Sequence, residues 1–203
     1  VKLQPNGGSV QTVTAPTTPK TVYVNMTTDC LYAKPGETLT PSVAYDGGWM
    51  HAYTYIDYNN DGKFTPKVNG NLSIEAGSDL VSFSFYGGND NENGKNSAGT
   101  SISGNGRNTL VMPAFTIPAD TKPGMYRMRY KVDWNSIDPA GSIDQSNPII
   151  GNGGGIIDVM LNIHGDYANV NDANRNGEVL SAVDNERLVT YKAPFGKDFK
   201  IKM

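Results

Sequence analysis

The sequence is poor in the residues that disulfide scaffolds, zinc sites and nucleic-acid-binding proteins need. Its single cysteine, Cys30, cannot form an internal disulfide, and two histidines, His51 and His164, cannot supply a zinc site of several imidazoles. Charged residues make up 18 % of the 203 residues and the net charge is −3. The chain therefore has no basic field of the kind that gathers nucleic acid or anionic lipid. No apolar run reaches the roughly 18 to 20 residues of a membrane span, so we expect no nucleic-acid partner and no membrane insertion of this chain.

Helical periodicity is also scarce, whereas turn formers are abundant, with 23 Gly and 12 Pro. No window sustains an i, i+3, i+4, i+7 stripe, and the best helical candidate, 184–191, is short. Short runs rich in Val, Tyr, Thr and Ile alternate instead with Gly, Pro and Asn, which is typical of strands. The expected strands are 22–27, 38–44, 51–57, 80–86, 109–116, 125–134 and 156–164. The predicted fold class is all-β, an antiparallel β-sandwich of jelly-roll-like form with little helix.

Three of these strands alternate clearly enough to assign faces. In 80–86, Val81, Phe83 and Phe85 alternate with Ser82 and Ser84. In 156–164 the residues predicted to face the core are Ile157, Val159, Leu161 and Ile163. In 125–134 an apolar face of Tyr126, Met128, Tyr130, Val132 and Trp134 alternates with Arg127, Arg129, Lys131 and Asp133. The pattern in 125–134 predicts an antiparallel strand with one face in water.

The predicted domain organisation is simple. Residues 1–20 carry Pro, Gly, Thr and Gln without periodicity, so we expect a linker or a loosely held N-terminal segment there. Residues 21–203 are predicted to form a single β-sandwich domain. Two long polar segments, 87–107 and 135–154, are candidate binding surfaces, or else solvated variable loops.

The segment 57–64 has the opening pattern of a calcium loop. Asp57, Asn59 and Asp61 would present side-chain oxygens and Lys63 its carbonyl, with a Gly between them where the chain turns sharply. The twelfth position, where an EF-hand carries a bidentate Glu, is Val68, so a complete EF-hand is excluded. The alternatives are a structural Ca²⁺ site completed by a ligand from elsewhere, and a tight turn alone.

Aromatic residues provide the candidates for carbohydrate binding, because sugar C–H faces pack on exposed rings. The candidates are Trp49, Tyr53, Tyr55 and Trp134. The alternative is that these rings fill the sandwich core. That alternative is favoured for Trp134, which continues an apolar strand face, whereas Trp49 follows a Gly-Gly turn and is the first choice for exposure.

Catalytic motifs are not recognisable. A glycoside hydrolase needs two carboxylates across a cleft, and nothing in the spacing of Asp133, Asp138, Asp144 and Asp158 pairs two of them. No Gly-x-Ser-x-Gly elbow is present, and nothing near Cys30 would activate its thiol.

Three segments together resemble the GEVED-type domain of exported Bacteroidetes surface proteins. They are the aspartate-rich turn 55–64, the Ile-Pro approach 115–119 and the Arg-x-Arg strand 124–130. The family's Gly-Glu-Val-Glu-Asp-Tyr motif has its nearest match at 154–159, where only Gly154 and Asp158 agree. The resemblance implies an accessory domain that is secreted or displayed on a bacterial cell surface, beside the neighbouring domains of a larger protein.

Three functions remain open. The first is a non-catalytic accessory module that binds glycan or supports a glycan-degrading partner domain, with carbohydrate as its ligand. The second is a protein-interaction or adhesion module, and the third is a fragment of a glycoside hydrolase. Exposed aromatics over a groove would favour the first, and a flat apolar patch or an open edge strand the second.

Overall fold

The computed structural model describes residues 1–16, 21–45, 50–85, 94–102, 109–133, 139–141, 154–164, 189–192 and 198–201. The chain divides into two compact units, Val1–His164 and Gly165–Met203. Within the described ranges there is no α-helix, and hence no helix long and apolar enough to cross a membrane.

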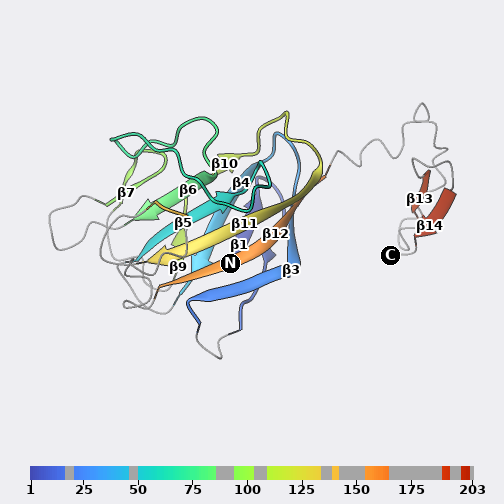
Figure 1. Cartoon of the computed structure of the whole chain (residues 1–203), viewed down its shortest axis with the longest axis horizontal. Helices are drawn as coiled ribbons and strands as arrows, with labels where there is room; N and C mark the ends of the chain where they lie inside the picture. The colour runs from blue at the N-terminus through green and yellow to red at the C-terminus, as the bar shows by residue number, and fades with distance from the viewer. Residues whose placement is uncertain are drawn as a thin grey trace. The chain divides into compact units, whose positions relative to one another are not determined.

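Two sheets build the first unit (Figure 1). The five-stranded sheet contains β1 (Lys2–Pro5), β2 (Gln11–Thr12), β4 (Thr38–Ala44), β9 (Thr109–Val111) and β10 (Phe115–Thr116). The seven-stranded sheet has the order β3 (Tyr23–Ala33), β12 (Gly155–Ile163), β11 (Gly124–Asp133), β5 (His51–Ile56), β6 (Leu80–Phe85), β7 (Gly94–Asn96) and β8 (Ser101–Ile102). All described pairs are antiparallel except β12 with β3, which is parallel. The predicted all-β sandwich is confirmed.

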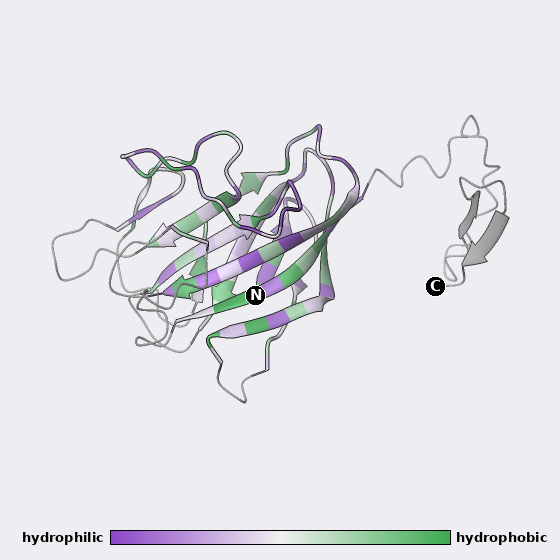
Figure 2. Cartoon of the chain, viewed as in Figure 1, coloured by the Kyte–Doolittle hydropathy of each residue, from purple (hydrophilic) through white to green (hydrophobic). Residues whose placement is uncertain are grey.

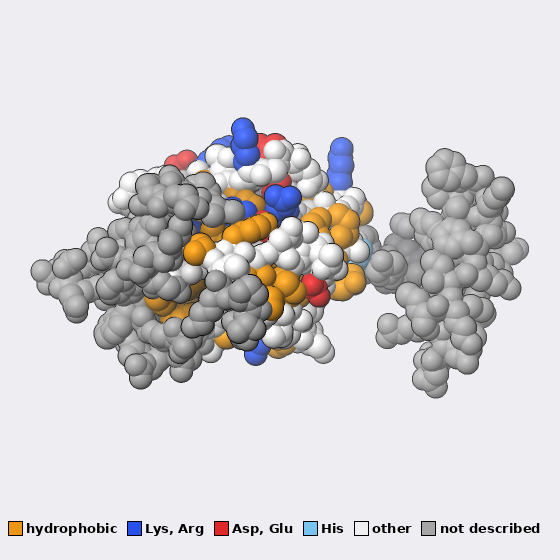
Figure 3. All heavy atoms as spheres, turned by 60° about the horizontal axis from the view of Figure 1, so that its bottom comes forward, with side chains coloured by type: hydrophobic (Ala, Val, Ile, Leu, Met, Phe, Trp, Pro, Cys, Tyr) orange, Lys and Arg blue, Asp and Glu red, His pale blue; other side chains and the backbone are white. Residues whose placement is uncertain are grey.

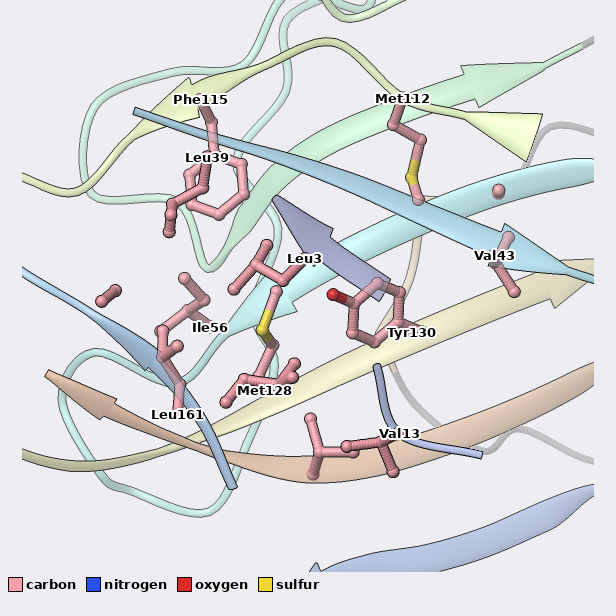
Figure 4. Packing of buried hydrophobic residues seen from close by; sticks show 14 of the residues in the cluster. Leu3, Val13, Leu39, Val43, Ile56, Met112, Phe115, Met128, Tyr130 and Leu161 are labelled. Carbon is pink, nitrogen blue, oxygen red and sulfur yellow. The ribbon is translucent and has the colours of Figure 1, made fainter. Parts of the chain in front are cut away.

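The inner faces of the two sheets share one hydrophobic core (Figure 4). The five-stranded sheet contributes Leu3, Leu39 and Val43, and the seven-stranded sheet contributes Met128, Tyr130, Leu161 and others. On β12, Val159, Leu161 and Ile163 are buried and Ile157 packs against the same cluster, as the alternation predicts. Figure 2 shows hydrophobic and hydrophilic residues alternating along these strands.

The N-terminal segment is more ordered than its composition indicates. β1 pairs with β4, with Leu3 opposite Pro41, and Leu3 is fully buried in the core. Val13, after β2, is buried as well. The segment 1–20 is predicted as a linker or a loosely held N-terminal segment, but its residues 2–5 and 11–13 supply part of the sandwich. Strands of two and four residues are too short to show an alternation in the sequence.

A second hydrophobic cluster covers part of the outer face of the seven-stranded sheet. It consists of Tyr53, Tyr55, Phe64, Leu80, Phe83 and Phe85, with Val68, Leu72 and Ile74 packed against it. β5 is consequently buried on both faces. The prediction that the charged face of β11 is solvated is wrong for Arg129, Lys131 and Asp133, which are all buried.

The second unit contains one described hairpin. β13 (Val189–Lys192) and β14 (Asp198–Ile201) pair antiparallel, with Val189 opposite Ile201. The helical candidate 184–191 thus ends within a strand. The division after His164 differs from the prediction of a single domain over 21–203.

Candidate functional site

The aspartate loop begins directly after β5 and folds around the side chain of Asp57. The Asp57 carboxylate accepts the backbone N–H of Asp61 on Oδ1 (3.2 Å) and that of Gly62 on Oδ2 (2.9 Å). Asn60 and Gly62 have φ of 54° and 80°, a left-handed conformation that Asn and Gly tolerate best. The carboxylate therefore shapes the loop through these two hydrogen bonds.

The other two predicted side-chain ligands lie in the same loop. Asn59 Oδ1 accepts the N–H of Asp61 (3.1 Å), and Asp61 Oδ1 accepts the N–H of Lys63 (2.8 Å). Asn59 Nδ2 donates to Asp61 Oδ2 at 3.1 Å. The structure thus brings Asp57, Asn59 and Asp61 together, as the motif predicts.

Asp79, immediately before β6, lies close to this loop. Its Oδ2 accepts the N–H of Thr65 at 2.7 Å. Burial raises the pKa of its carboxyl, and the charges of Asp57 and Asp61 raise it further. Hard oxygen donors of this kind suit Ca²⁺, and a cation would relieve that repulsion. Among the described residues, however, no three His, Cys, Asp or Glu side chains are arranged as a metal-ligand group.

Asp158, one of the candidate catalytic carboxylates, is held in a buried ion pair on the outer face. It lies opposite Arg129 in the register of β11 and β12. Arg129 donates from Nε to Asp158 Oδ1 (2.6 Å) and from Nη2 to Oδ2 (2.8 Å), and Tyr23 Oη also donates to Oδ2 (3.1 Å). The guanidinium lies 4.2 Å from the ring centroid of Phe64, and Nη1 donates to the carbonyl of Gly141. This carboxylate is therefore saturated with donors.

Asp133, the other described candidate, is also buried. The ammonium of Lys131 lies 3.3 Å from Asp133 Oδ2 and donates to the carbonyl of Ala140 at 2.8 Å. Burial, and after it the charge of Lys131, lower the pKa of the neighbouring His51 to about 4. Asp133 and Asp158 thus stabilise a covered face and do not line an open cleft. Asp138 and Asp144 fall outside the described ranges.

Two of the four predicted sugar-binding rings, Tyr53 and Tyr55, are buried. Tyr53 and Tyr55 are 1 % and 0 % exposed, and Tyr55 Oη donates to the carbonyl of Pro139 at 2.8 Å. Of the two alternatives, exposure or burial, Tyr53 and Tyr55 adopt burial, because the second cluster covers β5. Trp49 and Trp134 lie outside the described residues.

Comparison with known families identifies the chain. Residues 51–153, slightly more than half of its length, match the family described as the GEVED domain. The chain belongs to the GEVED domain family. No curated protein and no solved structure shows a significant match to it.

In this GEVED domain two of the three resembling segments, 55–64 and 124–130, meet at one place. Phe64 ends the aspartate-rich turn, and its ring covers the guanidinium of Arg129, the second Arg of the Arg-x-Arg strand. Asp158, which agrees with the family's Gly-Glu-Val-Glu-Asp motif, binds that guanidinium from β12. The matched range includes Phe64 and Arg129 and ends before Asp158.

The rest of the outer face of β3, β12 and β11 is not covered by the second cluster. We call it the Tyr32 face, and it consists of two rows, Tyr32–Asn162–Met125 and Cys30–Met160–Arg127. Tyr32 and Met125 are 50 % and 47 % exposed, and the other four are partly buried. Figure 3 shows hydrophobic side chains at the surface of the first unit with Lys and Arg among them.

Sequence reasoning missed this surface, although a signal for it exists. Met125 and Met160 stand at the outward positions of alternating strands, where polar residues are the rule for a solvated face. Apolar residues at outward positions, unless a cover lies above them, indicate an interaction surface.

Proposed function

We propose that this GEVED domain is a non-catalytic protein-interaction module of an exported, cell-surface bacterial protein. The observation that carries the proposal is the Tyr32 face, where the half-exposed Tyr32 and Met125 lie near Met160 and Arg127. These residue types are enriched at the centres of protein interfaces, whereas Lys, Glu and Asp are depleted there. The pairing of Asp133 and Asp158 with buried cations supports a non-catalytic role.

A direct test is to apply the whole chain, in Ca²⁺-containing buffer, to arrays of bacterial envelope proteins, host surface proteins and glycans. We expect saturable binding to protein targets that persists after the targets are enzymatically deglycosylated. Release of reducing ends from any of the polysaccharides would show a hydrolase and contradict the non-catalytic role.

Carbohydrate binding is the second candidate, favoured by one observation. The ring of Tyr32 is half exposed and lies beside the amide of Asn162 in the register of β3 and β12. A sugar uses this combination of ring and amide. Binding confined to glycan features of the array, and lost in Tyr32→Ser, would support this candidate over the first.

We further propose that the loop of Asp57, Asn59, Asp61 and the Lys63 carbonyl binds a structural Ca²⁺, with Asp79 as an additional oxygen donor. The support is that Asp57, Asn59 and Asp61 lie in one hydrogen-bonded loop, and that the charges of Asp57 and Asp61 help to raise the pKa of Asp79. Ca²⁺ at about 100 times its Kd should stabilise the folded chain by about 2.7 kcal/mol.

Asp61→Asn is the better variant for this test, because Asp57 also holds the loop's backbone N–H groups. We expect Ca²⁺ added after chelation to raise the Tm of the wild-type chain and that of Asp120→Asn, an exposed control. The rise should shrink or vanish in Asp61→Asn. Equal Tm values with and without Ca²⁺ in the wild type would leave the loop a turn alone.

A further inference from the structure

The Tyr32 face lies next to an edge strand, so a partner could in principle add a strand to β3 or cover the face. β3 is the outermost strand of the seven-stranded sheet and pairs only with β12 within it. An edge of this kind normally offers free N–H and C=O groups to another chain. Which of the two surfaces is available decides the kind of partner.

The edge of β3 is obstructed at three places. The side chain of Gln11 donates to the carbonyl of Tyr32 (2.8 Å) and accepts the N–H of Tyr32 (2.7 Å). The hydroxyl of Thr21 donates to the carbonyl of Tyr23 at 2.9 Å. Between these points residues 27–29 fall out of register with β12, because Met26 is opposite Val159 and Cys30 is opposite Met160. Bulges and side-chain caps prevent strand addition, so the face is the available surface.

The face also contains a fixed ring. The Gln11 amide holds the backbone of Tyr32 on both its polar groups, and the Tyr32 ring packs against His164 with centroids 6.5 Å apart. A half-exposed ring on a rigid backbone loses little conformational entropy when a partner binds. Met125 and Met160, in contrast, have flexible side chains that adapt to the shape of an apolar partner.

The Tyr32 face carries only positive charge. Arg127 is its one charged residue, and among the described residues no carboxylate forms an ion pair with it. Asp158 lies on β12 two residues from Met160, but it is fully buried and accepts hydrogen bonds from Arg129. A carboxylate on the partner would complement Arg127, and a guanidinium binds a carboxylate through two parallel hydrogen bonds.

Resting on the proposed function, we propose that the Tyr32 face docks a protein segment that presents apolar side chains to Tyr32 and Met125 and a carboxylate to Arg127. Tyr32 and Arg127 stand at opposite corners of the two rows, about 10 Å apart across the sheet and about 7 Å along the strands, or about 12 Å in all. A single short segment can span that distance.

The probe is a phage-displayed library of random twelve-residue peptides, selected on the whole wild-type chain in Ca²⁺-containing buffer. We expect the enriched peptides to combine apolar residues with Asp or Glu. Tyr32→Ser and Met125→Ser should each weaken their binding about tenfold or more, the size of effect seen at interface hot spots. Arg127→Gln should weaken binding and reduce its dependence on salt.

Val111→Ser is the matched control, because Val111 is 59 % exposed on β9 of the other sheet. It should leave peptide affinity unchanged. Thermal melts of all four variants check that each is folded, which we expect because the replaced side chains are exposed or partly exposed.

Each contrary result would overturn a different part of the proposal. Peptides that bind Tyr32→Ser and Met125→Ser as tightly as the wild type would place the interaction elsewhere and leave the proposed function standing. Peptides without Asp or Glu, indifferent to Arg127→Gln, would overturn the carboxylate. Self-association of the wild-type chain that is lost in Met125→Ser would replace the segment by a second copy, and enrichment of no peptide would overturn the proposed function as well.

Discussion

The buried ion pair between Arg129 on β11 and Asp158 on β12 illustrates how much one residue can determine in this fold. Asp158→Asn would leave the guanidinium of Arg129 charged beneath Phe64 and Gly141 with weaker acceptors. Removing one partner of a buried ion pair typically costs about 3–5 kcal/mol, so we expect a loss of that size in the free energy of unfolding, measured with urea.

The double variant Arg129→Met, Asp158→Leu serves as the control for that measurement. It removes both charges, so it should lose much less stability than Asp158→Asn alone. A single variant as stable as the wild type would mean that the guanidinium reaches water, contrary to its burial.

His51 makes stability depend on pH. Because burial lowers its pKa to about 4, the folded state stays neutral at this residue while the unfolded chain takes up a proton near pH 6.5. Stability is therefore fully present above about pH 6.5 and is lost as pH falls toward 4, by about 3 kcal/mol in total.

Urea unfolding of the wild type and His51→Gln between pH 7 and pH 4.5 measures this effect. The carboxylates titrate in both proteins, so the difference between the two curves isolates His51. We expect the wild type to lose stability more steeply, and parallel curves would contradict the buried, neutral imidazole.

At the scale of elements, the alternation of apolar and polar residues predicted the strands, but it did not predict which strand faces other segments cover. The alternation in 156–164 correctly assigns Val159 and Leu161 to the core, since a period of two is visible in a single strand. The cover over Arg129 depends on Phe64 and Gly141, which lie outside the strands and follow no period. The same holds for the site, where the aspartate turn was visible and the burial of Tyr53 and Tyr55 was not.

Gly141 tests how tightly that cover closes. A Cβ at this position would overlap the Cβ and the carbonyl oxygen of Phe64, so the cover must shift in Gly141→Ala. We expect a loss of about 1–3 kcal/mol, the usual cost of overpacking, measured by urea unfolding. Gly70→Ala is the control, because nothing lies within 4 Å of its Cβ, and it should be nearly neutral. Equal stability of the two variants would show that the segment around Gly141 can shift away from Phe64 at little cost in the free energy of unfolding.

Considered as a whole molecule, the fold extends beyond the range that matches the family. Residues 51–153 include β5 to β11, whereas β1, β3 and β4 precede that range and β12 follows it. β12 pairs with both β11 and β3 and supplies Val159, Leu161 and Ile163 to the core. The matched range alone therefore lacks strands that close the sandwich.

Two truncations test this extension. The chain 1–164 contains both hydrophobic clusters in full, so we expect cooperative unfolding in urea with a midpoint close to that of the whole chain. The chain 1–153 lacks β12, which exposes the edges of β11 and β3 and removes three core side chains, at about 2–5 kcal/mol for each large residue lost. Because small domains are stable by only about 5–15 kcal/mol, 1–153 should not fold. A cooperative transition in 1–153 would mean that the matched range and the strands before it form a domain without β12, and loss of folding in 1–164 would mean that the second unit is required.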